Sequence, residues 1–269
     1  MRGVLVLLPA MLSLALTFSA RADDAPFDAV DALAKEKVAA VDLLRQRAER
    51  QVALAAGDRL FAAYLNAATI GEGQRLQPRI AALLNSLVSR YGIREVAVTD
   101  RAGAFLARAG NVDRTIAAQN PETDPLLLAG FAAAPRRTET LQNARGLHLV
   151  APVFYRDRSE YVIDARQDFS SYHAVLSHGL TPDRFVVLTN AKGVILADGG
   201  NGATGGTVIV AKLTLDAIRK AAPGGHGEVV ASGLRYRVSY RPVGDWIIVA
   251  VERVPAPRRC HAEGARLCG

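Results

Sequence analysis

The N-terminal part of the chain has a hydrophobic pattern with the period of a helix. Between residues 27 and 65, apolar side chains recur every three or four positions and form one stripe, at Val41, Leu44, Ala48, Val52 and Ala55. Gly71 and Gly73 interrupt this pattern. A second stripe over residues 76–88 follows, and Gly92 comes after it as a stop signal. The pattern predicts a helical region over residues 23–92, with one long helix and a shorter one.

From residue 94 the pattern changes to the alternation that is typical of strands. Residues 95–99 and 104–107 are strand-like, and the short turn between them contains Gly103. An apolar helix is predicted over 126–134, and three further strands are predicted over 138–142, 146–155 and 160–169. Strands in this order, with one helix among them, indicate an antiparallel sheet rather than a parallel one.

The second half of the chain repeats this plan. A strand-turn-strand segment at 186–197 precedes a predicted helix at 213–222 and strands at 227–231, 234–242 and 245–254. Several residues recur at a constant offset of 90 positions: Thr99 and Thr189, Gly103 and Gly193, Ala107 and Ala197, Pro152 and Pro242, and Val153 and Val243. We therefore expect an α+β fold in which a long N-terminal helix precedes two tandem antiparallel-sheet modules, residues 93–180 and 181–254.

The first 22 residues have the pattern of an export signal. Arg2 precedes an uncharged apolar run over residues 3–20, and the small residues Ala20 and Ala22 suit a signal peptidase. We expect a cleaved signal peptide over 1–22, a mature protein that starts at Asp23, and a periplasmic location. An uncleaved membrane anchor is the alternative. No other stretch has the ~18 apolar residues that a membrane span needs, so the mature chain is expected to be soluble.

Charge and cysteine content narrow the class of protein further. Loss of Arg2 and Arg21 with the signal peptide lowers the formal net charge from +7 to +5, and the remaining basic residues are scattered, which argues against nucleic-acid binding. The two cysteines, Cys260 and Cys268, both lie in the C-terminal tail, residues 255–269. In an oxidising compartment they are expected to form a local disulfide, and a metal site with His261 is the alternative.

The chain lacks the motifs of common enzyme classes. His173 and His178 are five residues apart and miss the spacing of helical metal ligands, and no H-E-x-x-H, G-x-S-x-G or P-loop sequence occurs. The glycine-rich segment 199–206 lacks the lysine of a phosphate loop. The sequence therefore predicts neither an enzyme nor a bound cofactor or metal.

The export signal, the long helix and the two repeated units together resemble the double Cache, or PAS-like, sensor domains of bacterial receptors. Residues 93–107 and 236–254 carry the resemblance most clearly. It implies two PAS-like modules, a small ligand held by the first of them, and signalling. Such domains normally lie between two membrane spans, and no second stretch of this sequence is apolar enough to form a span. We therefore expect a freestanding form that signals to a separate membrane-bound sensor kinase or receptor.

The candidate site residues lie in and beside the predicted strand at 160–169. Alternation places Val162, Asp164, Arg166 and Asp168 on one face, where a ligand pocket, a structural ion pair or a wet surface would accommodate the charges. The resemblance implies that Asp168 occupies the position of the aspartate that binds amino-acid ligands. The nearest substitutes for the family's aromatic and arginine cluster are Tyr155, Arg156 and Tyr161. The expected ligand is small and polar, an amino acid or an organic acid.

Two further features leave alternatives open. One face of a predicted strand in the second module carries Arg235, Arg237, Ser239 and Arg241. This face is either solvated or a surface that binds an anion or a partner. His148 is either a core or surface histidine or a ligand contact. The alternative function is a periplasmic structural or assembly factor without a small ligand, whose long helix pairs with another chain, for instance in a homodimer.

Overall fold

The computed structural model describes residues 27–110, 123–143, 146–200, 224–231 and 233–255. Its first elements are α1 (Asp28–Ala56), α2 (Arg59–Leu65) and α3 (Ile70–Tyr91). The single helix predicted over 27–65 is therefore wrong. The chain leaves α1 at Gly57, and the Asp58 carboxylate caps α2 by accepting a hydrogen bond from the Leu60 amide at 2.9 Å.

The start of α3 also differs from the prediction. Gly71 and Gly73 lie inside its first turn and do not precede it. The helix begins with a capping box: the Glu72 amide donates to Thr69 Oγ1 at 3.2 Å, and the Glu72 carboxylate accepts from the Thr69 amide at 3.3 Å. The predicted stop at Gly92 is confirmed, because this residue ends α3 with a φ of 65°.

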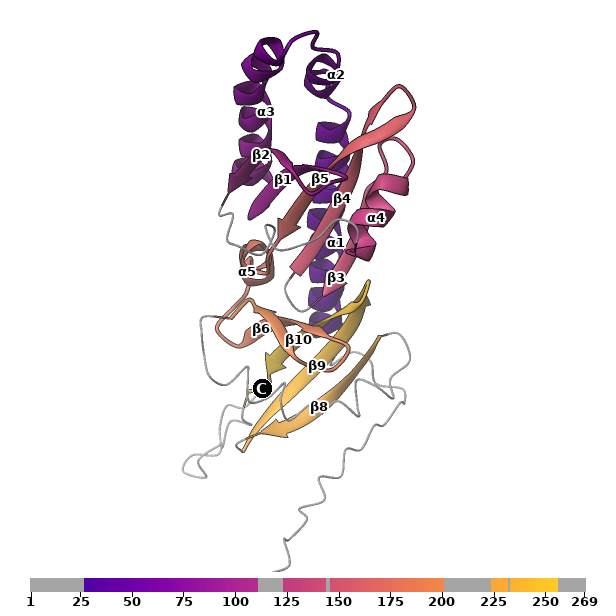
Figure 1. Cartoon of the computed structure of the whole chain (residues 1–269). Coiled ribbons are helices and arrows are strands. Elements are labelled where there is room, and N and C mark those ends of the chain that lie inside the picture. The colour runs from indigo at the N-terminus through magenta and orange to yellow at the C-terminus, as the bar shows by residue number, and fades with distance from the viewer. Residues whose placement is uncertain (1–26, 111–122, 144–145, 201–223, 232, 256–269) are drawn as a thin grey trace, which may run out of the picture.

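Within the described residues, the strands form two five-stranded antiparallel sheets (Figure 1). The first sheet has the order β2-β1-β5-β4-β3, and its strands are β1 (Glu95–Asp100), β2 (Phe105–Gly110), β3 (Glu139–Asn143), β4 (Gly146–Tyr155) and β5 (Arg158–Gln167). The second has the order β7-β6-β10-β9-β8, with β6 (Arg184–Asn190), β7 (Ile195–Asp198), β8 (Gly225–Ala231), β9 (Leu234–Val243) and β10 (Trp246–Arg253). The two orders are the same, which confirms the predicted α+β fold with two antiparallel sheets.

The first hairpin of each sheet shows the internal repeat in detail. Asp100 and Asn190, 90 positions apart, end the first strand of their hairpins. Each side-chain Oδ1 accepts two amide hydrogen bonds across the turn, at 2.8–3.0 Å. Each hairpin also has a register shift immediately before a threonine, Thr99 or Thr189. The offset seen in the sequence thus corresponds to two hairpins with the same local structure.

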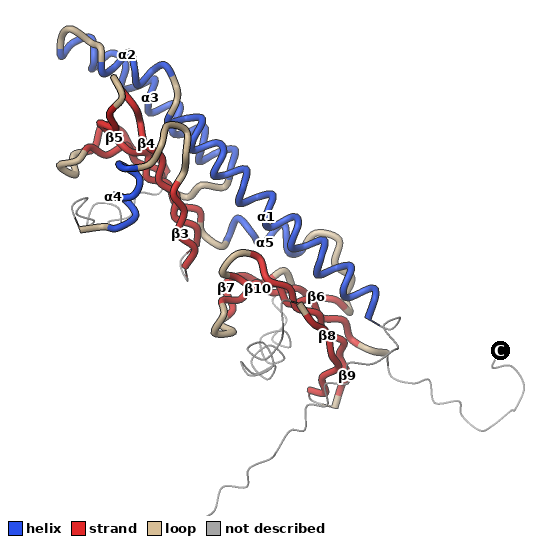
Figure 2. The backbone as a smooth tube through the Cα atoms, turned by 90° about the vertical axis from the view of Figure 1, so that its right-hand side faces the viewer, coloured by secondary structure: helices blue, strands red, loops and turns tan. Residues whose placement is uncertain are grey.

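Helix α1 lies along one face of both sheets and joins them into one hydrophobic core (Figure 2). Its buried stripe includes Val41, Ala48 and Val52, and these side chains share a core with Ile163 of β5 and Ile248 of β10. We call the sheet faces toward α1 the inner faces, and the opposite faces the outer faces. The stripe that predicted the helix is therefore the surface that unites the two sheets.

Two short helices complete the described structure. Helix α4 (Pro125–Ala132) covers part of the outer face of the first sheet, where Leu127 and Phe131 pack on Val150 and Val162 (Figure 2). Helix α5 (Ser170–Ser177) connects β5 to β6 and so links the two sheets.

Three predictions concern residues outside those that the structure describes: the signal peptide at 1–22, the helix at 213–222 and the disulfide between Cys260 and Cys268. Among the helices that are described, none combines the length and the apolar character needed to cross a membrane.

Candidate functional site

Four polar side chains gather on the outer face of the first sheet: Glu95 of β1, His148 of β4, and Asp164 and Arg166 of β5. The register places Arg166 between Glu95 and His148, and Asp164 two residues away on the same face. Glu95, His148 and Asp164 are only 4%, 8% and 1% exposed. Charged groups are costly to bury unless they are paired, so this outer-face cluster requires an explanation.

The cluster is organised as two pairs. Nε2 of His148 lies 2.5 Å from Oδ1 of Asp164, and Nε of Arg166 lies 3.5 Å from Oε1 of Glu95. Burial raises the pKa of Glu95 above its ordinary value; the Arg166 guanidinium opposes this rise, and the Asp164 carboxylate adds to it. Each buried carboxylate therefore lies beside a nitrogen-bearing side chain, Glu95 beside the Arg166 guanidinium and Asp164 beside the His148 imidazole.

Apolar and cationic groups lie next to the cluster. Leu127 and Phe131 of α4 cover the adjoining part of the face, and the Arg101 guanidinium lies 4.8 Å from the centre of the Phe131 ring. On β2, the guanidinium of Arg108 lies 3.3 Å from the centre of the Phe105 ring. The outer face thus offers apolar contact beside a few converging polar groups, which is the composition of small-molecule sites.

The second sheet has no such cluster at the equivalent positions. When the sheets are aligned through the register of their central strands, Glu95, His148, Asp164 and Arg166 correspond to Phe185, Val238, Val249 and Val251. These four residues belong to an apolar cluster on the outer face of the second sheet. The same strand arrangement thus has charged side chains at these positions in the first sheet and apolar side chains in the second. The fold itself therefore does not require the charges.

Of the predicted site residues, Asp164 and Arg166 belong to the cluster and Asp168 does not. Asp168 lies just beyond the end of β5, where its Oδ1 accepts a hydrogen bond from the Ser170 amide at 3.0 Å. Its Oδ2 lies 3.4 Å from Arg94, and both side chains are partly exposed. The observed contacts of Asp168 are those of a residue that fixes the start of α5.

The three remaining predicted residues lie away from the cluster. Tyr155 and Arg156 are at the turn between β4 and β5, where the Tyr155 hydroxyl donates to Asn66 at 2.6 Å and the Arg156 guanidinium lies 5.0 Å from the Tyr155 ring centre. Tyr161 lies on the inner side, with its ring centre 6.4 Å from that of Tyr64. The structure therefore does not bring the proposed aromatic and arginine group together with Asp164 and Arg166.

Two members of the cluster were not predicted as site residues. His148 interrupts an otherwise apolar strand, which is a detectable signal, but its partner Asp164 is 16 residues away and is reached only through strand register. Glu95 is the first residue of its strand, and a solvent-exposed residue at a strand end would fit the sequence pattern equally well. Neither position can be assigned to a site before the order of the strands is known.

The arginine-bearing face of β9 turns toward α1. Ser239 Oγ donates to one oxygen of the Asp31 carboxylate, and Arg241 donates to the other at 2.9 Å. Desolvation would raise the pKa of Asp31, but the hydrogen bond from Ser239 and the charge of Arg241 outweigh it, and the pKa is lower than its ordinary value of 3.8. Part of this face therefore docks α1 onto the second sheet.

The rest of the face forms ion pairs within the second sheet. Arg235 lies 2.6 Å from Glu228, and Arg237 lies 3.8 Å from Glu252. In the part of the chain that the structure describes, no three His, Cys, Asp or Glu side chains are grouped closely enough to hold a metal ion.

Comparison with solved structures identifies the fold. The sensor domain of the V. cholerae histidine kinase DctB matches with a TM-score of 0.57 and 14% identity, over 87% of this chain and 99% of that domain. The ligand-binding domain of the Campylobacter jejuni chemoreceptor Tlp3, in complex with L-norvaline, matches with a TM-score of 0.62 and 10% identity, over 86% and 91%. For the Pseudomonas aeruginosa PAO1 amino-acid chemoreceptor PctC, in complex with GABA, the values are 0.56 and 17%, over 84% and 99%.

These three structures are double Cache sensor domains, and this chain has their fold. At the level of sequence, no family profile and no curated protein matches the chain.

Proposed function

We propose that this chain, which has the double Cache fold, is a sensor that binds a small polar ligand on the outer face of its first sheet. The observation that carries this proposal is the buried cluster of Glu95, His148, Asp164 and Arg166, together with its replacement by apolar residues in the second sheet. Buried titratable groups that the fold does not need are typical of binding sites.

The ligand that suits these side chains is an amino acid or an organic acid. Arg166 can donate to a carboxylate, Asp164 can accept from an ammonium group, and Phe131 and Leu127 can contact an apolar part. The solved complexes of Tlp3 with L-norvaline and of PctC with GABA support this class of ligand.

The proposed place of action is the periplasm, reached through the signal peptide at 1–22, and the proposed recipient of the signal is a membrane-bound sensor kinase or receptor. The fold supports this role, since DctB is a histidine kinase and Tlp3 and PctC are chemoreceptors. A homodimer through α1 is part of the proposal. Leu43 and Leu54 of this helix are 56% and 57% exposed, although most large apolar side chains of the described structure are covered.

The same two leucines favour the second candidate function, a structural or assembly factor that binds no small ligand. A thermal-shift screen of the mature protein with amino acids, organic acids, amines and purines, followed by calorimetry, separates the two functions. A ligand at 100 times its Kd stabilises the folded state by about 2.7 kcal/mol, which raises the Tm by several degrees. If no compound raises the Tm, the sensor function is wrong and the assembly factor is preferred.

A further inference from the structure

The end of the first sheet that carries the outer-face cluster also contacts the second sheet. His148 and Arg166 are paired in one row of the sheet. The adjacent row, one residue away on each antiparallel strand, contains Gln142, Leu147 and Gln167 side by side. Neighbouring residues on a strand point to opposite faces, so the first row faces outward and the second faces inward. The cluster and the inward row are therefore joined through single peptide units.

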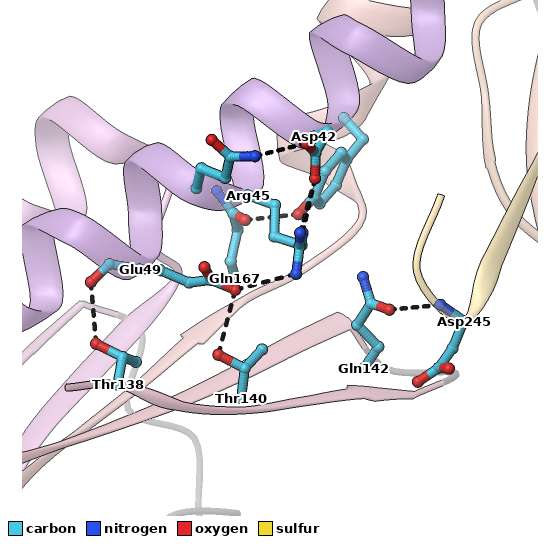
Figure 3. A network of polar contacts seen from close by, with 10 residues as sticks. Asp42, Arg45, Glu49, Thr138, Thr140, Gln142, Gln167 and Asp245 are labelled. Carbon is cyan, nitrogen blue, oxygen red and sulfur yellow. Dashed lines mark hydrogen bonds and ion pairs between the residues drawn. The ribbon is translucent and has the colours of Figure 1, made fainter. Parts of the chain in front are cut away.

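Both glutamines of the inward row make polar contacts at the junction of the two sheets. Oε1 of Gln142 accepts a hydrogen bond from the Asp245 amide, in the turn between β9 and β10, at 2.7 Å (Figure 3). Gln167 is only 1% exposed and connects two helices. Its Nε2 donates to the Tyr91 carbonyl at the end of α3 at 3.1 Å, and its Oε1 accepts from the Tyr172 hydroxyl of α5 at 2.7 Å.

Tyr172 continues these contacts into the second sheet. Its ring packs edge-on against Trp246, the first residue of β10, with 5.4 Å between ring centres, and Phe169 packs against the same indole at 5.3 Å. Burial raises the pKa of Tyr172 above its ordinary value of 10.0, so its hydroxyl remains a hydrogen-bond donor. A continuous set of contacts thus runs from β5 through α5 to β10, the central strand of the second sheet.

The junction also contains polar groups that its present arrangement does not satisfy. Nε1 of Trp246 and Nε2 of Gln142 are buried and have no hydrogen-bond acceptor among the described residues. A buried donor without an acceptor carries a desolvation penalty. A small shift of one sheet against the other would lose some packing contacts at the junction. If the shift brought a hydrogen-bond acceptor to one of these donors, the new hydrogen bond would offset part of that loss. Two arrangements of this junction can therefore be close in free energy.

We propose that this junction is a conformational switch, in which Gln167 links the state of the outer-face cluster to the packing of Trp246. The inference rests on the proposed function, because it assigns a response to ligand contact with Arg166 or His148. A ligand that displaces the ends of β4 and β5 also displaces Gln167, which changes the position of Tyr172 and the contact of its ring with Trp246.

Trp246 is the only tryptophan of the chain, so fluorescence excited selectively in tryptophan, and not in the seven tyrosines, reports on this junction alone. The first measurement uses acrylamide quenching and no ligand. The substitution His148→Gln should change the quenching constant of Trp246 about twofold, and the same substitution in a Gln167→Met background should have less than about a third of that effect. Should the His148 variant not fold, Glu95→Gln serves the same purpose.

Asp58→Ala is the matched control, because it removes one side-chain hydrogen bond from the first turn of α2, at the far end of the first sheet (Figure 1). It should lower stability and leave the quenching constant unchanged. An equal response to His148→Gln with and without Gln167, or no response in either background, overturns the switch.

A second measurement separates the switch from the sensor function itself. A compound that binds in calorimetry should alter Trp246 emission in the wild type, and it should bind the Gln167→Met variant within about threefold of the same affinity without that change. A compound that binds the wild type and leaves Trp246 emission unchanged overturns the switch and supports the sensor function. If no compound binds, the sensor function is wrong, and the quenching experiment still decides whether the junction is coupled.

Discussion

Asp164 and Asp168 lie four residues apart in one segment, yet their surroundings differ in kind. Asp164 is buried on the outer face and pairs with His148. Asp168 lies past the end of the strand, accepts a hydrogen bond from the Ser170 amide and pairs with Arg94 near the surface. The sequence pattern does not distinguish these aspartates, because alternation places both on the same face of the strand predicted over 160–169. Because β5 ends at Gln167, one aspartate is a candidate ligand contact and the other lies in the turn before α5.

The first prediction uses this difference. Asp164→Asn should weaken binding of a ligand found in the screen by about 10- to 100-fold, because a charge-assisted hydrogen bond contributes about 1.5–3 kcal/mol. Asp168→Asn should change the affinity less than about twofold, since Asp168 lies outside the cluster. Calorimetry on both variants measures the two effects, and a larger loss for Asp168→Asn would restore the assignment made from the resemblance.

Sequence alone could reach part of this site, for a physical reason. The alternation of residues 160–167 places Asp164 and Arg166 on one face without knowledge of the neighbouring strands. Their partners His148 and Glu95 come from β4 and β1, and a shift of one residue in either register would move them to the other face. Periodicity within a strand is local, but a site shared by three strands depends on long-range pairing.

At the scale of whole elements, the position of α4 depends on a close approach at Gly130. A Cβ at this position would lie 2.2 Å from Cγ1 of Val150, so Gly130→Ala should separate α4 from the sheet and cost about 1–3 kcal/mol. Gly71→Ala is the matched control. It also lies in a helix but has no atom within 4 Å of its Cβ position, and alanine there should stabilise the protein by about 0.5–1 kcal/mol. Urea unfolding of both variants tests the contrast, which equal effects would contradict.

A second prediction at this scale concerns the docking of α1 on β9. The lowered pKa of Asp31 means that the folded state favours its carboxylate more than the unfolded chain does. The resulting stabilisation is complete above the unfolded pKa and is lost as the pH falls through the lower folded pKa. The free energy of unfolding should therefore decrease between about pH 5 and pH 2 more steeply in the wild type than in Asp31→Asn.

Asp28→Asn provides the comparison, because Asp28 is exposed in the same first turn. This variant should keep the acid sensitivity of the wild type in chemical unfolding measured across that pH range. A wild-type slope in Asp31→Asn would show that other carboxylates, and not the docking of α1, control the response to acid.

Element boundaries show a further limit of the pattern. The apolar periodicity of α1 continues into α2 through the buried Phe61, so hydrophobicity alone joins the two helices into one. The break depends on local polar chemistry, namely Gly57 followed by the capping side chain of Asp58. Similarly, Thr69 and Glu72 were a recognisable capping box, and the glycines beside them misplaced the start of α3.

At the scale of the whole molecule, the internal repeat of the sequence corresponds to two sheets with the same strand order and different outer faces. The first sheet keeps buried charges and the second keeps valines and a phenylalanine at the equivalent positions. The repeat was visible in the sequence because turn residues such as Gly103 and Gly193 are constrained by backbone conformation, with φ of 83° and 76°. The outer faces differ in composition although the strand order is the same, so the role of each sheet could not be inferred from the repeat.

The last prediction concerns assembly through α1. Leu43 and Leu54 are eleven residues, or about three turns, apart and so lie on one side of the helix, while the core stripe of α1 packs on the sheets. If this side forms a homodimer, the double variant Leu43→Glu/Leu54→Glu places charges in an apolar interface and should be monomeric in sedimentation velocity, whereas the wild type is dimeric.

Ile70→Glu is the control, because Ile70 is 83% exposed at the start of α3, on a different helix, and the change should leave the dimer intact. A wild type that stays monomeric at high protein concentration contradicts dimerisation through α1. A dimer that survives the double leucine variant and dissociates with Ile70→Glu would place the interface at the tip formed by α2 and α3.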